Sequence, residues 1–203
     1  MGRKLWNVKK VDKTLAVGLA ERNRLYPVAA LIASSRGIDT DEKVRAFFFN
    51  EVEPSSPYDL PDMAKAVQAI RTALDRFDRI AICGDYDADG VTATALLYSY
   101  LEQQGADVLY RIPERSEGYG LKKETIDFCA EQNVKLIITV DCGVSCVEEA
   151  EYARQKGIDM VVTDHHRVGD VLPDCLAVVD PYRADCALPT SGKRAGKTPA
   201  LLS

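Results

Sequence analysis

From residue 79 onward, short apolar runs alternate with longer amphipathic stretches, and this alternation constrains the fold more than any other feature of the sequence. The short runs have four to six residues and are rich in β-branched or aromatic side chains, which is typical of β-strands. We expect five strands, at 79–83, 107–112, 135–140, 159–163 and 176–179. Helical spacing of apolar residues predicts helices between them, at 91–104, 122–132 and 145–156. The pattern predicts a doubly wound α/β fold with a mainly parallel five-stranded sheet.

The first 78 residues have a different pattern of apolar residues, without the expected strands, and are expected to form a helical lead-in. The predicted helices cover 28–35, 41–49 and 62–77, with a turn-rich segment at 53–58. We expect Phe47-Phe48-Phe49 to pack on the sheet rather than to stack on bases, because aromatic runs are usually core. The last residues have no strand or helix period. The expected domains are therefore a lead-in at 1–78, an α/β domain at 79–186 and an irregular tail at 187–203.

Charge is unevenly distributed along the chain, whose formal net charge is −5. Residues 1–50 carry ten Lys/Arg and five Asp/Glu, whereas residues 81–180 carry eight and nineteen. An acidic region repels nucleic acid and phosphate substrates unless bound divalent cations cancel its charge. A solvated acidic face balanced by nearby lysines gives the same count. Metal binding is thus an early hypothesis.

Membrane insertion and secretion are not expected. The longest aliphatic run, 28–33, is too short to span a bilayer, and the N-terminus does not lead into the apolar region of a secretory signal. The six cysteines form no C-x-x-C pair and are interpreted as reduced thiols. Only two histidines occur, so a structural zinc site is not expected either. We expect a cytoplasmic protein.

Aspartates follow four of the five expected strands, and both histidines accompany them. In chain order these residues are Asp85, Asp87, Asp89, Asp141, Asp164, His165, His166 and Asp180. Ligands of open parallel sheets bind beyond the carboxyl ends of the strands, so these side chains are expected at one edge. A single aspartate after a strand is usually a cap or turn residue. Four such strand ends together indicate a site.

Crowded carboxylates repel one another unless a cation neutralises them. Oxygen ligands with one or two imidazoles suit Mn²⁺ or Mg²⁺, and carboxylates shared between two ions are typical of two-metal phosphoryl chemistry. The residues therefore predict hydrolysis of a phosphodiester or phosphoanhydride bond.

The segment after the second strand carries groups suited to a nucleic-acid substrate. Arg111 and Arg115 are suited to gripping a phosphate, and Tyr119, next to Gly118, to stacking on a base. Gly143 is expected to let the backbone approach a ligand and to open a helix that attracts phosphate. A surface loop with incidental arginines and an ordinary tight turn at Gly143 are the alternatives.

Three motifs, in order, resemble those of the DHH phosphoesterase superfamily, and within it the RecJ-type branch of single-strand-specific 5′→3′ DNA exonucleases. They are Gly84-Asp-Tyr-Asp-Ala-Asp-Gly-Val-Thr92, Val140-Asp-Cys-Gly-Val-Ser145 and Thr163-Asp-His-His166. The loop Glu117-Gly-Tyr-Gly-Leu121 and the lead-in, with Arg36-Gly-Ile-Asp-Thr40 and Leu60-Pro-Asp-Met63, resemble the same branch. The resemblance covers roughly residues 6–183, and three motifs in order are more specific than one short pattern.

The resemblance implies a set of residue roles and partners. The implied metal ligands are Asp87, Asp89, Asp141 and His165, with His166 near the scissile phosphate and Asp85 and Asp164 orienting the ligands. It further implies two Mn²⁺ or Mg²⁺ ions, single-stranded DNA as substrate, and a role in DNA repair and recombination. Single-strand-binding protein and a helicase are the implied partners. Some relatives have a histidine ligand at the position of Cys83, so we expect that coordination position to be lost or filled by water.

In the family, the domain continues with a further helical stretch and another metal-binding aspartate, followed by a second domain and a nucleotide-binding barrel. The sequence from about Ala187 does not resemble the family, so we expect a truncated or frame-disrupted C-terminus and an incomplete DHH domain. One alternative is thus an inactive fragment of a RecJ-type enzyme, and another is a DHH-type phosphoesterase for short oligonucleotides or small phosphate substrates. A third is a haloacid-dehalogenase-type phosphatase with Asp87 as nucleophile, which leaves Asp164-His165-His166 without a role.

Overall fold

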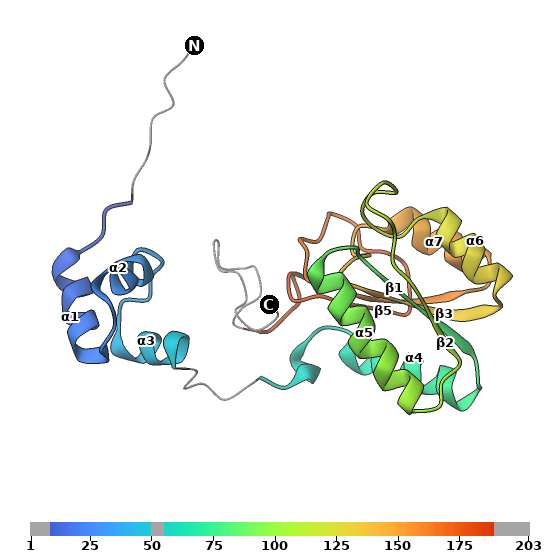
Figure 1. Ribbon diagram of the computed structural model, residues 1–203, viewed down its shortest axis with the longest axis horizontal. Coiled ribbons are helices and arrows are strands. Elements are labelled where there is room, and N and C mark those ends of the chain that lie inside the picture. Colours follow the sequence, from blue (N-terminus) through green and yellow to red (C-terminus); the bar gives the residue numbers. More distant parts are fainter. Residues whose placement is uncertain (1–8, 50–54, 189–203) are drawn as a thin grey trace, which may run out of the picture. The chain divides into compact units, whose positions relative to one another are not determined.

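The computed structural model describes residues 9–49 and 55–188, and the chain divides into two compact units between Pro54 and Ser55 (Figure 1). The expected boundary was residue 78. The division comes earlier because helix α4 (Met63–Asp75) packs against the sheet, with Ala66 and Ala73 buried in the sheet's core. The predicted tail at 187–203 lies almost entirely outside the described residues.

The first unit contains three helices, α1 (Lys13–Asn23), α2 (Pro27–Ser35) and α3 (Asp41–Phe48). They share a small core in which Leu19, Ala30 and Val44 are fully buried. Helix α1 was not predicted, and its buried side consists mainly of Ala16, Leu19 and Ala20, too few large apolar side chains for a clear helical period.

The three phenylalanines at the end of the first unit are exposed within that unit. The rings of Phe47 and Phe48 pack edge to face, with centroids 5.1 Å apart. Their packing against the sheet stays a prediction.

The second unit is a doubly wound α/β domain, as predicted. All strands are parallel in the order β2-β1-β3-β4-β5, and their bounds are β1 Arg79–Gly84, β2 Val108–Arg111, β3 Val134–Val140, β4 Asp159–Thr163 and β5 Ala177–Val179. Strands β1, β3, β4 and β5 are mostly buried runs of aliphatic residues, as strands covered on both faces must be.

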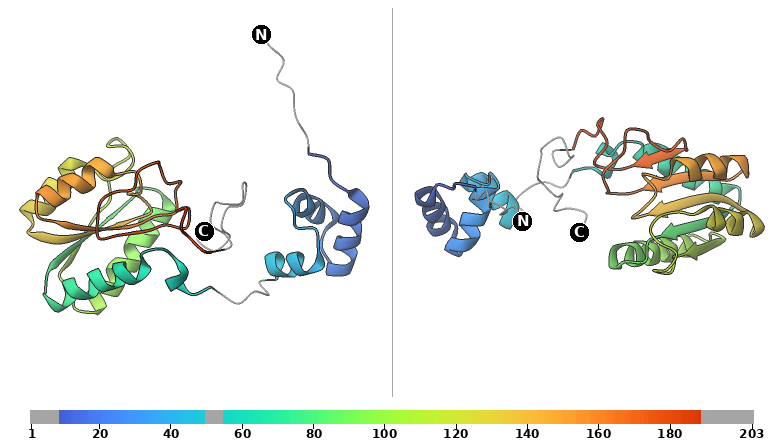
Figure 2. Two further views of the ribbon diagram at one scale, coloured as in Figure 1. Left: turned by 180° about the vertical axis from the view of Figure 1, so that it is seen from behind. Right: turned by 90° about the horizontal axis from the view of Figure 1, so that it is seen from above.

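Helices cover both faces of the sheet (Figures 1 and 2). A short 3₁₀ turn, η1 (Pro57–Asp59), leads to α4, which shares one face with α5 (Ala88–Gln103). The other face is covered by α6 (Lys123–Glu131) and α7 (Val147–Gln155). Chain order reverses between β1 and β3, and the carboxyl ends beside such a switch point are where open α/β sheets bind ligands.

The remaining expectations from composition concern cysteines and membranes. All six cysteines are free thiols, as expected. Within the described ranges, no helix has the length and apolar character needed to cross a bilayer.

Candidate active site

An aspartate follows the last paired residue on each of four neighbouring strands. Gly84, Val140, Thr163 and Val179 lie in register across β1, β3, β4 and β5. The next residues are Asp85, Asp141, Asp164 and Asp180, which we call the aspartate row. All four are buried, with 0% to 9% of their surface exposed. Backbone bonds extend the pairing into the row, because the amides of Asp141 and Asp164 donate to the carbonyls of Thr163 and Val179.

Asp87 and Asp89 lie at the start of α5, beside the row. The Asp87 carboxylate caps the helix by accepting from the amides of Asp89 and Gly90, both at 3.0 Å. These bonds, first of all the one from Gly90, hold the pKa of Asp87 below its usual value. A Cβ atom at Gly90 would lie 2.4 Å from the carbonyl oxygen of Asp85, so only glycine fits this turn.

Asp141 meets His165 across the ends of β3 and β4. The His165 Nε2 atom lies 2.8 Å from Asp141 Oδ1. Burial raises the pKa of Asp141, the charge of Asp87 adds to this effect, and the contact with His165 opposes it. Asp141 has a left-handed backbone, with φ of 57°, which aspartate tolerates better than most residues.

Asp164 holds both histidines in place. Its Oδ1 atom accepts from the backbone amides of His165 and His166, at 2.8 and 3.1 Å, and lies 2.8 Å from the ring Nδ1 of His166. Its Oδ2 atom accepts from the amide of Val144 at 2.9 Å. Burial lowers the pKa of His166, but the hydrogen bond and charge of Asp164 outweigh it and the pKa is raised overall. Asp164 therefore links both histidines to the turn after β3.

The loop after β2 reaches the same edge. Arg111 forms an ion pair with Glu117 at 3.0 Å, and the guanidinium of Arg115 lies 5.1 Å from the ring centroid of Tyr86. The Tyr119 hydroxyl lies 3.0 Å from the backbone oxygen of Asp141. Sequence analysis had suggested only a stacking role for Tyr119, because a hydrogen bond between loops leaves no local pattern.

Gly143 lies two residues after Asp141, in the segment that follows β3. Its φ is +108°, and a Cβ atom there would lie 2.4 Å from Thr139 Oγ1, so the position requires glycine. The expectation that Gly143 opens a helix is wrong, because α7 begins only at Val147 and the intervening residues form a turn.

The donor set fits a hard divalent cation. Asp141, His165 and His166 offer ligand atoms that all lie within 4.8 Å of one another, a group that does not include Asp87 or Asp89. Asp85 Oδ1 and Asp180 Oδ2 are buried and have no hydrogen-bond partner among the described residues. Buried carboxylate oxygens without partners are costly unless a proton or cation satisfies them.

Asp180 was noted after the fifth strand but was given no role in the site. Burial raises its pKa to about 7, with the charge of Asp164 adding to the effect. Its position after the strand, equivalent to those of Asp85, Asp141 and Asp164, was the available signal. Cys83 does not offer a ligand, because its buried thiol contacts Cys129, and this contact and burial raise the thiol pKa.

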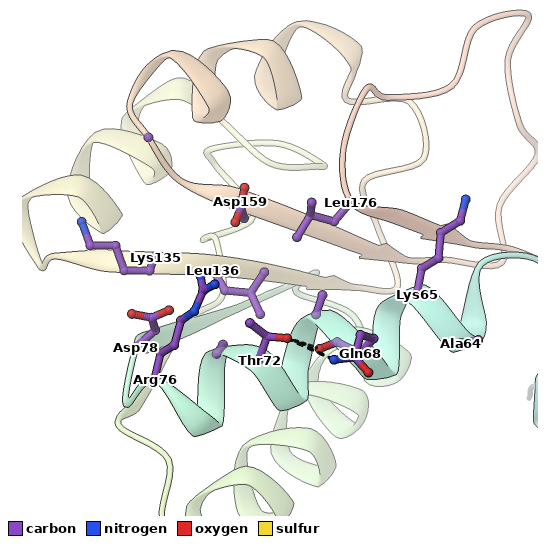
Figure 3. A pocket seen from close by; sticks show the side chains of 13 residues that line it. Ala64, Lys65, Gln68, Thr72, Arg76, Asp78, Lys135, Leu136, Asp159 and Leu176 are labelled. Atoms are coloured by element: carbon purple, nitrogen blue, oxygen red, sulfur yellow. Dashed lines mark hydrogen bonds between the residues drawn. The ribbon is translucent and has the colours of Figure 1, made fainter.

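Two cavities lie outside the aspartate row. The larger, of about 710 Å³, lies between α4 and the starts of β3 and β4, where Gln68 and Thr72 face Lys135 and Asp159 (Figure 3). It is at the opposite edge of the sheet from the row. The smaller, of about 460 Å³, is lined by Arg111, Glu117, Lys122 and other residues of the loop after β2 and of α6, so it adjoins the candidate substrate side.

A doubly wound parallel sheet with buried carboxylates and paired histidines at its carboxyl edge offers the groups that metal-dependent phosphoester hydrolysis uses. The chain belongs to the DHH family: the model of the family's N-terminal domain matches residues 79–197. The chain is 36% identical over 186 residues to the single-stranded-DNA-specific exonuclease RecJ of Bacillus subtilis (strain 168), covering 91% of this chain and 24% of that protein.

Solved structures agree with this assignment. A crystal structure of exonuclease RecJ bound to manganese matches with a TM-score of 0.62 and 37% identity, over 68% of this chain and 35% of that one. RecJ in complex with Mn²⁺ from Thermus thermophilus matches with a TM-score of 0.64 and 29% identity, over 91% of this chain and 26% of that one. The chain spans about a quarter of the length of the curated relatives it matches.

Proposed function

We propose that this chain supplies the metal centre of a RecJ-like, single-stranded-DNA-specific 5′→3′ exonuclease that hydrolyses phosphodiester bonds. The observation that carries the proposal is the aspartate row, a set of four buried carboxylates at one edge of the sheet, of which Asp141 and Asp164 contact His165 and His166. The similarity to single-stranded-DNA-specific exonucleases supports the choice of substrate.

The proposed ligands of two Mn²⁺ or Mg²⁺ ions are Asp87, Asp89, Asp141 and His165. When bound, the ions would activate a water molecule and stabilise the charge that develops on the phosphoryl oxygens. Asp85 and Asp164 orient these ligands. With its Nδ1 engaged by Asp164, His166 keeps Nε2 free, and in the protonated ring this atom would donate to an oxygen of the scissile phosphate group.

The proposed DNA side of the site consists of Arg111, Arg115, Gly118, Tyr119 and Gly143. Arg111 is the last residue of β2 and Arg115 lies in the loop that follows, so both are at the carboxyl edge and are suited to phosphate. Arg111 is paired with Glu117, so a phosphate must compete with that carboxylate for the guanidinium.

The cellular role follows from the same proposal. An exonuclease of this kind acts in DNA repair and recombination, with single-strand-binding protein and a helicase as partners, in the cytoplasm. A haloacid-dehalogenase-type mechanism is not favoured, because the Asp87 carboxylate is engaged in capping α5 and the chain belongs to the DHH family.

Calorimetric titration with Mn²⁺, alongside hydrolysis of a 5′-labelled single-stranded oligonucleotide, tests the proposal. Asp141→Asn keeps the shape of the buried side chain but removes its charge, and Asp75→Asn changes an exposed residue of α4 as the control. We expect Mn²⁺ binding and cleavage by the wild type and the control, and loss of both in Asp141→Asn. Equal Mn²⁺ affinity in Asp141→Asn would contradict the site, and Mn²⁺ binding without cleavage would identify an inactive fragment.

A further inference from the structure

The Tyr119 hydroxyl joins three chain segments at the candidate site. Tyr119 lies on the loop after β2, and its hydroxyl oxygen is 3.0 Å from the backbone oxygen of Asp141, after β3. The same oxygen is 3.0 Å from the ring Nδ1 of His166, after β4. The two rings meet edge to face, with centroids 5.5 Å apart.

The chemistry of these partners fixes the direction of each hydrogen bond. A backbone carbonyl only accepts, so the single hydroxyl proton of Tyr119 goes to Asp141. The remaining contact then requires a proton on Nδ1 of His166. Asp164 Oδ1 requires the same proton, because this oxygen already accepts from two backbone amides. Tyr119 and Asp164 thus select the same tautomer, which leaves Nε2 of the neutral ring unprotonated.

The backbone conformation of the loop after β2 places Tyr119 at the candidate site. Its neighbours Gly118 and Gly120 have φ of +81° and +86°, in the left-handed region that favours glycine. A Cβ atom at Gly118 would meet nothing within 4 Å, so backbone conformation rather than space requires glycine there. Glu117 anchors the start of the turn by pairing with Arg111 and accepting from the amide of Glu114 at 2.6 Å.

We propose that Tyr119 is a positioning residue, whose hydroxyl fixes the ring of His166 and the backbone at Asp141 and so couples the loop after β2 to the metal-binding edge. This role is separate from stacking on a base, which needs only the ring. Its consequence for metal binding rests on the proposed function, whereas the hydrogen-bonded arrangement itself is present in the metal-free chain.

The first experiment observes the imidazoles of the metal-free protein by ¹⁵N–¹H NMR. The chain has only two histidines, so each ring signal is assigned by a single substitution. Tyr119→Phe removes only the hydroxyl. The matched control is Tyr152→Phe, which removes a hydroxyl that donates to Asp127 at 2.9 Å on the surface of α6 and α7.

In Tyr119→Phe we expect the Nδ1 proton of His166 to shift and to exchange with water several-fold faster. In Tyr152→Phe both histidines should keep their wild-type signals. His166 signals that coincide in Tyr119→Phe and wild type would overturn the inference, whether or not the protein binds metal.

The second experiment separates positioning from stacking by comparing Tyr119→Phe with Tyr119→Leu. We expect Tyr119→Phe to weaken Mn²⁺ binding roughly 10-fold, because the hydroxyl positions the backbone of the proposed ligand Asp141. It should leave binding of a single-stranded oligonucleotide in the presence of chelator unchanged, and only Tyr119→Leu should weaken it. Equal loss of oligonucleotide binding in both variants would assign the hydroxyl to the DNA and overturn positioning.

These measurements also distinguish failure of the inference from failure of the proposed function. A wild-type chain that binds no Mn²⁺ would contradict the metal centre, and the NMR comparison would still decide the role of the hydroxyl. A wild-type chain that binds Mn²⁺ with the same affinity as Tyr119→Phe would overturn the positioning role alone.

Discussion

His165 Nε2 lies 2.8 Å from Asp141 Oδ1, so two proposed ligands of one ion are in contact across the ends of β3 and β4. In the metal-free protein this contact favours the ionised form of Asp141 against the effect of burial, and a bound cation would have to replace it. Proton and metal therefore compete at this position.

This competition predicts that Mn²⁺ affinity falls as pH is lowered. Ligands must be deprotonated to bind a metal, and burial raises the pKa of Asp141. We expect affinity to fall as pH is lowered below neutral, with protons released on binding, and His165→Gln to weaken binding by about 10-fold or more. Calorimetry in buffers of different ionisation enthalpy measures the Mn²⁺ affinity and the number of protons released on binding. An affinity that does not change with pH would exclude Asp141 and His165 as ligands.

Asp180 should destabilise the metal-free fold as pH rises. Its pKa is raised to about 7 in the folded protein, above its ordinary value of 3.8. The unfolded chain therefore loses the proton first, and folding stability falls between about pH 4 and pH 7. Asp180→Asn lacks this titration. The free energy of unfolding of the variant relative to wild type should therefore be higher above pH 7 than at pH 4, by at most about 4 kcal/mol.

Urea unfolding in the presence of EDTA measures the effect at Asp180, with exposed Asp170→Asn as the control. A difference between Asp180→Asn and wild type that is the same at pH 4 and pH 8 would refute the prediction.

The first turn of α5 should not tolerate a side chain at Gly90. A Cβ atom would lie 2.4 to 2.7 Å from the backbone of Asp85, which a flexible side chain cannot relieve. We expect Gly90→Ala to destabilise the domain by about 2–4 kcal/mol. Gly169→Ala is the control, since a Cβ atom there has only an ordinary contact at 3.9 Å and should leave stability within about 0.5 kcal/mol of wild type. Thermal unfolding of both variants checks the prediction, which equal melting temperatures would contradict.

A partly buried ion pair between Asp62 and Arg183 should connect the start of α4 to the segment after β5. Arg183 Nη1 contacts Asp62 Oδ2 at 2.5 Å and the backbone oxygen of Val178 at 2.6 Å. Burial raises the pKa of Asp62, but its hydrogen bonds with Lys65 and Arg183 outweigh this and lower the pKa overall. The pair therefore stabilises the fold above the ordinary aspartate pKa of 3.8, and its contribution is lost as pH falls through the lower folded value.

A double-mutant cycle of Asp62→Asn and Arg183→Met should give a coupling of about 1–3 kcal/mol at pH 7 that is lost once the pH falls below the lowered folded pKa of Asp62. Lys65→Met, which removes the exposed partner of Asp62, should cost less than about 1 kcal/mol. Coupling that persists at low pH would show that packing, and not charge, connects the two segments.

The sequence predicted the strands closely because buried parallel strands are short β-branched runs with clear ends. Helix α1 was missed because its small buried side gives a weak period. The position of α4 was misjudged because local pattern does not reveal which core a helix joins. Strand-end aspartates were recognisable, but their alignment depends on register between strands far apart in the chain. The contacts of Tyr119 were unpredictable for the same reason.

The aspartate row also has a kinetic meaning. Asp85 and Asp180 are 95 positions apart in the chain and follow strands that are not paired directly, so the row is complete only after β1, β3, β4 and β5 have all paired. A slip of one residue in any strand would displace one carboxylate by roughly 3.3 Å and leave it on the opposite side of the pleat. The proposed ligands follow β1, β3 and β4, so a divalent cation held by all of them would bind only when these strands are correctly paired. The ion would therefore bind late in folding, stabilise only the native strand register and slow unfolding.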